Sequence, residues 1–167
     1  MSLMLLACVI SLALAIPCSV VAEEAPVPEG KLSIGVEEEV MLLPWGVKLP
    51  ARVDTGAAMT SLDARHLVVK GKVAEFQLPE RYGGLRLSMP IVGWKSVRSA
   101  EHRERRPVVE LEICLGPKRL KIRANLNDRS LVKYPMILGR NVLREGFFVD
   151  CDCVNLLPPS CAQPVAK

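Results

Sequence analysis

Histidine and aromatic residues are scarce in this chain of 167 residues. The sequence holds two histidines, three Phe, two Trp and two Tyr. It contains no His-Glu-x-x-His motif for zinc and no Gly-x-x-x-x-Gly-Lys-Ser/Thr loop for nucleotide phosphates. The few aromatics are not interleaved with the basic residues, which argues against a stacking platform for single-stranded nucleic acid. We therefore expect no metal, no cofactor and no nucleic-acid partner.

Charge is missing from the first 22 residues, which are mostly apolar. Val20 and Ala22 are typical of a secretory signal cleaved after Ala22. However, the run lacks a leading Lys or Arg and approaches the ~20 residues that span a bilayer, so a retained anchor is the alternative. We expect four parts: signal peptide or anchor 1–22, a Pro- and Glu-containing linker 23–30, a folded domain 31–153 and a Pro-rich tail 154–167. The protein is then periplasmic or otherwise exported, and membrane-bound only if the first segment is retained.

Export affects the expected state of the four cysteines that follow this segment, Cys114, Cys151, Cys153 and Cys161. In an oxidising compartment they can form two disulfides in three connectivities. Cys151 and Cys153 would point to the same side of a strand, so they are poorly placed to pair with each other. A disulfide that ties down the tail through Cys161, and free buried thiols, both remain open.

Short apolar or alternating segments separated by turn residues fill the rest of the chain. They predict strands at 32–36, 40–43, 47–53, 67–69, 73–76, 108–115, 120–126, 136–138 and 147–149. Residues 141–144 predict a short helix that ends before Gly146. Residues 79–106 are polar and glycine-containing, so we expect a long exposed excursion there. The pattern indicates an all-β barrel or folded sheet with one short C-terminal helix.

One motif suggests chemistry. Asp54 directly follows the apolar strand 47–53 and is followed by Thr55, Gly56 and Ala57. Gly56 permits a tight turn in which backbone N–H groups face the carboxylate. Such turns are common as ordinary strand caps, so this motif alone is weak evidence for catalysis.

A second motif strengthens the case, because the apolar run Met136–Leu138 is followed by Gly139, Arg140 and Asn141. The pair resembles the two signatures of retropepsin-like aspartic proteases, which implies catalytic Asp54, supporting Thr55, Gly56 and Ala57, and a structural motif of Ile137, Leu138, Gly139 and Arg140. More closely, the chain resembles the glutamate-ligase-associated bacterial family labelled "putative ATP-dependent zinc protease". The matching segments are 53–57 with Thr60-Ser61, 106–109, 126–130 and 134–140.

The chain has only one Asp-Thr/Ser-Gly motif, whereas aspartic protease chemistry uses two carboxylates around one water. A symmetric homodimer would supply the second Asp54. We therefore expect an exported, homodimeric aspartic endopeptidase that hydrolyses peptide or isopeptide amides. A noncatalytic peptide-binding or regulatory module of the cell envelope with the same fold is the alternative.

The remaining expectations concern the roles of arginine residues. In the resembling family the arginine after the apolar-apolar-Gly motif pairs with an acid just after the catalytic loop. Ala58 occupies that position here, so Asp63 or Asp128 could pair with Arg140 instead. Residues 79–106 would form a flap over the substrate. The flap arginines could then bind anionic, glutamyl-rich substrates: Arg98, Arg103, Arg105 and Arg106.

Overall fold

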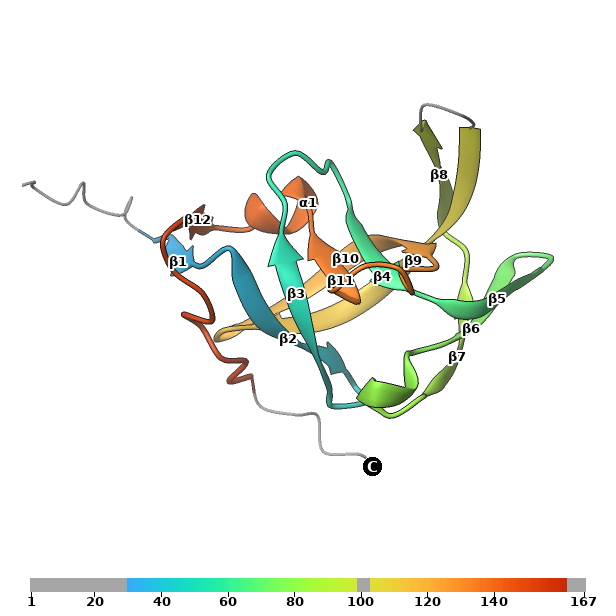
Figure 1. Cartoon of the computed structure of the whole chain (residues 1–167), viewed down its shortest axis with the longest axis horizontal. Coiled ribbons are helices and arrows are strands. Elements are labelled where there is room, and N and C mark those ends of the chain that lie inside the picture. Colours follow the sequence, from blue (N-terminus) through green and yellow to red (C-terminus); the bar gives the residue numbers. More distant parts are fainter. Residues whose placement is uncertain (1–29, 99–102, 162–167) are drawn as a thin grey trace, which may run out of the picture.

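A computed structural model describes residues 30–98 and 103–161 of the chain (Figure 1). The predicted signal or anchor, and nearly all of the predicted linker, lie outside the described residues. The described part is almost entirely β-structure with one short α-helix, which confirms the predicted fold class. None of its helices is both long and apolar enough to cross a membrane.

The elements follow one another as short strands. Their bounds are β1 Leu32–Ile34, β2 Glu37–Leu43, β3 Val47–Val53, β4 Thr60–Asp63, β5 Arg65–Lys70, β6 Val73–Gln77, the 3₁₀ turn η1 Glu80–Tyr82, β7 Arg86–Pro90, β8 Gly93–Arg98, β9 Arg103–Leu115, β10 Lys118–Asn127, β11 Met136–Leu138, α1 Arg140–Leu143 and β12 Phe147–Val149.

Six of these strands close into a barrel. The order β10-β4-β11-β3-β2-β9 is completed by antiparallel pairing of β9 with β10, and β8 extends the sheet beyond β9. Strand β3 shows why the sequence adopts this arrangement, since Leu49, Ala51 and Val53 are buried while the residues between them are exposed. This period of two puts one face of the strand into the core. The core therefore fills the barrel interior.

Strand β11 lies between β3 and β4, although the two are close neighbours in sequence. It runs parallel to β3 and antiparallel to β4. The connection from β3 to β4, residues 54–59, therefore spans the width of an intervening strand, and it rises beside α1 at the top of Figure 1. This wide loop carries the Asp-Thr-Gly-Ala motif.

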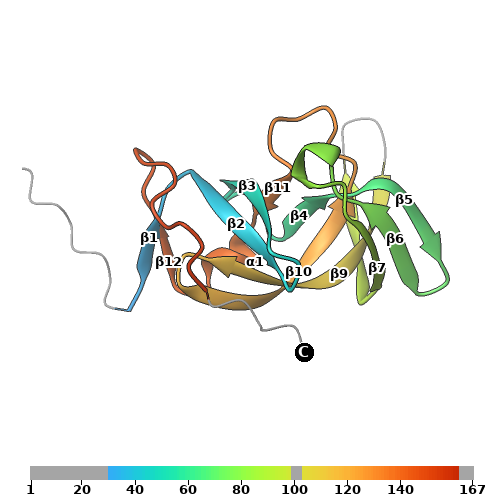
Figure 2. The same ribbon diagram turned by 90° about the horizontal axis from the view of Figure 1, so that it is seen from below.

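The prediction that residues 79–106 are exposed is confirmed, since among their described side chains only Pro79 and Leu87 are buried. The segment nevertheless consists mostly of strands and is not an irregular excursion. Strand β7 pairs with β6 in a separate three-stranded sheet, β5-β6-β7, which lies to one side of the barrel in Figure 2. Strand β8 pairs with the first part of β9, and this hairpin projects from the barrel in Figure 1. It has little hydrophobic alternation because it extends beyond the core, and its connecting residues 99–102 lie outside the described part.

The tail is fastened across the barrel as far as residue 161. A disulfide joins Cys114 of β9 to Cys161, which decides between the alternatives left open by the sequence. The buried Glu38 carboxylate accepts backbone hydrogen bonds from Leu156 and Leu157 over 3.0 and 3.1 Å, and from Gly35 over 2.7 Å. A carboxylate inside the protein is stable when its oxygens are bonded in this way.

Candidate active site

Strand β3 delivers Asp54 to the start of a turn in which two backbone N–H groups hold its carboxylate. Gly56 and Ala57 donate to Asp54 Oδ1 over 2.9 and 3.0 Å, and the Asp54 N–H donates to Leu138 O over 3.0 Å. A Cβ at position 56 would lie 3.2 Å from Asp54 Oδ1, so glycine leaves room for both bonds. Asp54 Oδ2 has no hydrogen-bond partner among the described residues, which leaves it available to a water molecule or substrate.

Gly139 brings the second motif against residues 54–59, the loop that is predicted to be catalytic and is called the catalytic loop here. It is buried, and a Cβ there would lie 2.5 Å from the Met59 carbonyl carbon and 2.8 Å from Thr60 N. Its φ of −88° is accessible to any residue, so the requirement for glycine comes from the close approach of two backbones. Its N–H donates to Thr60 Oγ1 over 3.2 Å. The apolar-apolar-Gly strand and the Asp54 loop therefore form one packed unit.

Sequence reasoning gave Thr60 and Asn141 no role, although both fix this unit. Thr60 N and Thr60 Oγ1 donate to Asn141 Oδ1 over 2.8 and 3.1 Å. Asn141 Nδ2 in turn donates to Arg123 O over 2.8 Å. One amide side chain thus links the end of the catalytic loop to β10. Both residues belong to segments that carry the family resemblance, so the resemblance was the signal that could have identified them.

Arg140 binds the catalytic loop directly, which corrects the expectation that it pairs with Asp63 or Asp128. Its Nη1 donates to the carbonyl oxygens of Thr55 and Gly56 over 2.9 and 2.8 Å, and its backbone N–H donates to Ala57 O over 2.8 Å. Asp63 and Asp128 make other contacts, which are described below. Arg140 therefore needs no acidic partner, and the alanine at position 58 is compatible with an ordered loop.

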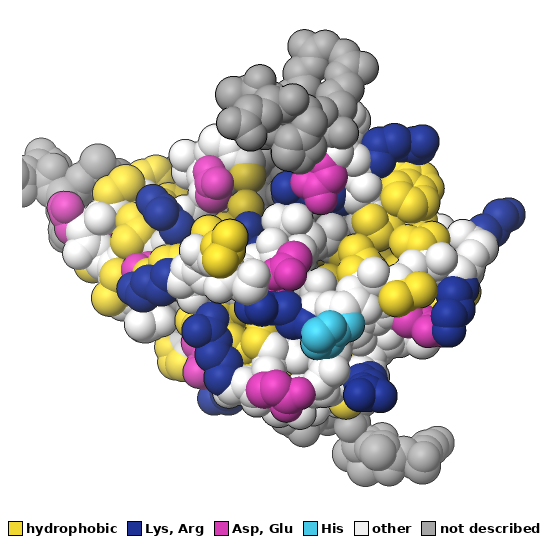
Figure 3. Space-filling model, turned by 45° about the vertical axis from the view of Figure 1, so that its right-hand side comes forward, with side chains coloured by type: hydrophobic (Ala, Val, Ile, Leu, Met, Phe, Trp, Pro, Cys, Tyr) yellow, Lys and Arg dark blue, Asp and Glu magenta, His cyan; other side chains and the backbone are white. Residues whose placement is uncertain are grey.

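Asp54 lies in a cleft of about 1040 Å³. The charged side chains that line it are Glu37, Arg52, Asp54, Arg129 and Lys133. Lys133 lies 3.5 Å from the Glu37 carboxylate, which also accepts a hydrogen bond from the Tyr134 hydroxyl. Arg52 and Arg129 have no acidic partner within salt-bridge distance among the described residues, so apart from Asp54 the unpaired charge in the cleft is positive. On the face shown in Figure 3, basic side chains are dispersed among acidic and uncharged ones.

The predicted substrate arginines are not gathered in this cleft. Arg105 stacks on Trp94, with its guanidinium carbon 5.2 Å from the ring centroid. Arg106 pairs with Glu104 over 2.7 Å. Both line a different hollow, formed with β4–β5 and the end of β10. The side chains of Arg98 and Arg103 lie outside the described part of the structure.

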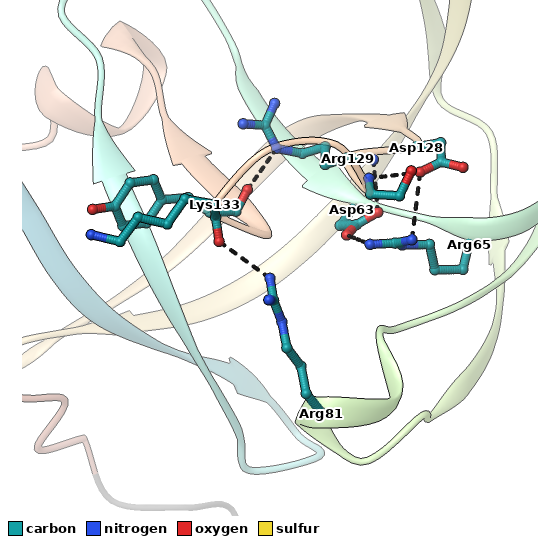
Figure 4. A network of polar contacts seen from close by, with 8 residues as sticks. Asp63, Arg65, Arg81, Asp128, Arg129 and Lys133 are labelled. Atoms are coloured by element: carbon teal, nitrogen blue, oxygen red, sulfur yellow. Dashed lines mark hydrogen bonds and ion pairs between the residues drawn. The ribbon is translucent and has the colours of Figure 1, made fainter.

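The segment 128–135, called the cleft loop here, supplies the residues that sequence reasoning missed. It lines one side of the cleft, and polar contacts fix it at both ends (Figure 4). The buried Asp63 Oδ1 accepts the Arg129 N–H over 2.9 Å, and Arg81 donates to Lys133 O over 3.2 Å. Asp63 Oδ2 is held by Arg65 over 2.8 Å. Arg129 lay within a matching segment, but nothing in the sequence placed it beside Asp54.

Two groups in the cleft loop, Arg129 and Asp128, have pKa values that are shifted from their ordinary values. Burial lowers the pKa of the half-buried Arg129 guanidinium from its ordinary value, and the nearby Arg106 lowers it further, while Asp63 and Asp54 act in the opposite direction. Hydrogen bonds from Ser130 lower the pKa of the exposed Asp128 carboxyl. Arg65 and His66 act on Asp128 in the same direction. Arg129 remains cationic at neutral pH, because arginine does not deprotonate in proteins.

The site as a whole presents one rigid, accessible carboxylate and a half-buried guanidinium. Within residues 30–98 and 103–161 no group of three or more His, Cys, Asp or Glu is placed to hold a metal ion. A carboxylate held by two N–H groups can act as a general base toward a bound water, provided that an acid is present to polarise the substrate carbonyl.

Comparisons with known proteins agree with this geometry. The chain is 29% identical over 130 residues to a probable alpha-L-glutamate ligase of Parasynechococcus marenigrum (strain WH8102), covering 72% of this chain and 28% of the ligase. The crystal structure of Lpg0085, a protein of unknown function (DUF785) from Legionella pneumophila, is similar with a TM-score of 0.64 and 30% identity, covering 74% of this chain and 96% of that one. Residues 33–153 match the family described as RimB-like, retropepsin-like aspartic endopeptidase RimB. The chain therefore belongs to the RimB-like family of retropepsin-like aspartic endopeptidases.

Proposed function

We propose that this chain is an aspartic endopeptidase that works as a homodimer, in which two Asp54 carboxylates activate one water. The observation that supports this most directly is the Asp54 carboxylate itself. It is fixed by two N–H groups through one oxygen, whereas the other oxygen has no partner among the described residues. A protein that only binds peptides does not need a carboxylate presented in this way.

The chemistry requires a second acid. Two carboxylates a few ångströms apart cannot both ionise at ordinary cost, so the pair shares one proton. The ionised member removes a proton from the water, and the protonated member donates a hydrogen bond to the scissile carbonyl. The hydroxyl adds to the carbonyl carbon, the C–N bond breaks, and the amine leaves with a proton. Because each chain contributes one Asp54, the twofold axis of the dimer would pass between the two loops.

The substrate class that we propose is a peptide or isopeptide rich in glutamyl groups. The cleft contains Arg52 and Arg129, whose charges have no acidic partner within hydrogen-bonding distance in the described residues. One relative is named as a probable alpha-L-glutamate ligase, and this chain covers 28% of its length. A positive cleft favours the approach of anionic substrates.

We further propose that the protein is exported. The Cys114–Cys161 disulfide supports this location, since structural disulfides persist chiefly in oxidising compartments. The apolar first 22 residues support it independently.

The test is the Asp54→Asn variant, compared with wild type on a mixed peptide library and on glutamyl-rich peptides. The variant keeps a side chain of the same size, so we expect the fold and the dimer to persist while hydrolysis is lost. Sedimentation velocity reports the assembly, and mass spectrometry reports the cleavage. Equal cleavage by the variant, or full activity in a strictly monomeric fraction, would contradict the proposal. Peptide binding by a wild type that never cleaves would favour the noncatalytic module.

A further inference from the structure

Two arginines of the Asp54 cleft, Arg52 and Arg129, have no acidic partner among the described residues, and of these Arg129 is the one that is partly buried. Its side chain is half-buried and lines the cleft together with Asp54 and Thr55. Figure 4 shows its guanidinium directed away from the cluster of Asp63, Arg65 and Asp128. Burying a cation is costly unless an anion or hydrogen-bond acceptors compensate it.

The hydrogen bonds of Arg129 fix its direction and leave its outer nitrogens unused. Nε donates to Tyr134 O over 3.0 Å, and the backbone N–H donates to Asp63 Oδ1 over 2.9 Å. Neither terminal nitrogen has an acceptor within hydrogen-bonding distance among the described residues. The Asp63 carboxylate binds Arg65 over 2.8 Å and the Arg129 backbone N–H, and the Arg129 guanidinium points away from it (Figure 4). The guanidinium is thus pre-positioned with its terminal donors available.

We infer that Arg129 is the anchor for a carboxylate of the substrate, bound beside the scissile amide. A planar guanidinium with two parallel free N–H groups matches a carboxylate in a bidentate pair. Arg106, close enough to Arg129 to repel it, raises the local positive potential but is itself paired with Glu104. Arg129 determines specificity and takes no part in the bond-breaking step. This inference rests on the proposed function for its placement next to a reacting amide.

The carboxylate could come from a glutamyl side chain or from the C-terminus of the peptide. With either carboxylate bound to the guanidinium, the substrate would have to place its scissile amide on the side that faces the Asp54 loop. The cleft loop is anchored at both ends. The guanidinium would therefore already hold its position before the substrate binds. A donor fixed in advance makes binding more favourable.

Binding can be tested without hydrolysis, in the Asp54→Asn background. The probes are labelled hexaglutamate and hexaglutamine peptides, each with a free or an amidated C-terminus, measured by fluorescence anisotropy. Adding Arg129→Gln should weaken hexaglutamate binding about 10- to 100-fold, the usual effect of losing hydrogen bonds between charged groups. Binding of amidated hexaglutamine should be nearly unchanged. Arg129→Lys, which keeps the charge but not the fork, should lie between the two.

Arg86→Gln is the matched control, because it removes one exposed arginine from β7, outside the cleft. It should leave hexaglutamate binding close to that of the parent. A loss confined to peptides with a free C-terminus would identify that terminus as the bound group, and a loss for both forms would identify a side chain. Equal weakening of hexaglutamate and amidated hexaglutamine, or no measurable hexaglutamate binding by the parent, would overturn the inference.

Kinetics with the intact Asp54 then separate this inference from the proposed function. If wild type hydrolyses glutamyl peptides, Arg129→Gln should lower kcat/KM for them about 10- to 100-fold, and Arg129→Lys should lower it less. If wild type hydrolyses nothing, the proposed function fails, and the binding result still decides the role of Arg129.

Discussion

Gly139→Ala is the sharpest test of how the catalytic loop is built. The added methyl carbon would lie 2.5 Å from the Met59 carbonyl carbon, where ordinary contacts begin near 3.4 Å. The loop backbone would therefore have to move by nearly 1 Å. Both neighbours are backbone atoms, so no side chain can rotate away to relieve the contact. We expect a loss of about 1–3 kcal/mol in the free energy of unfolding, which is typical of an overpacked core.

The displacement would also reach the carboxylate. Met59 and Thr60 end the loop that begins at Asp54, and a misplacement of about 1 Å in a catalytic group can cost on the order of 10²-fold in rate. We expect kcat on a glutamyl peptide to fall by that factor even where the protein is fully folded, as measured by urea unfolding and initial rates. Gly93→Ala is the control, because its nearest contact would be an ordinary 4.0 Å from Val108 Cβ. Wild-type stability and activity in Gly139→Ala would refute the packing argument.

Three further predictions concern stability. Arg140→Met removes the two hydrogen bonds to catalytic-loop carbonyls, so the free energy of unfolding should fall by about 1–3 kcal/mol in urea titrations; an unchanged midpoint would count against this role. Cys161→Ser opens a disulfide that spans 47 residues and should cost up to about 4 kcal/mol. A reductant should then lower the Tm of wild type but not of the variant. Glu38→Gln replaces an acceptor of three backbone N–H groups and should speed hydrogen exchange at residues 156 and 157, whereas the more exposed Glu39→Gln should not.

Much of the barrel could be predicted because its strands bury alternate residues. Strand β3, for example, has the bounds that its alternation indicates, since every second side chain enters the core. Strand β4 could not be found in this way. Its residues Thr60, Ser61 and Asp63 are polar and yet buried. Thr60 and Asp63 are bonded by Asn141 and Arg129, which lie far along the chain.

The site likewise contains some residues that could be placed from the sequence and others that could not. Gly56 could be placed because backbone geometry within its own motif requires a glycine there. Gly139 could be identified only through the family resemblance, because the backbone that it approaches closely is that of Met59 and Thr60, far away in the sequence. Arg129 could not be placed beside Asp54, because its position depends on how Asp63 and Arg81 hold the cleft loop. The flap arginines were chosen for their local density of charge, and Arg105 and Arg106 instead interact with neighbours within their own hairpin.

The contacts of Arg140 with Thr55 and Gly56 have a consequence for assembly. The hydrogen bonds that Asp54 and Arg140 make in the catalytic turn join residues of one polypeptide. In the proposed dimer, each subunit would therefore hold its half of the catalytic centre in shape before it meets the other. Two such halves would come together with little conformational entropy left to lose, so the affinity between subunits would depend mainly on the surfaces around the turn.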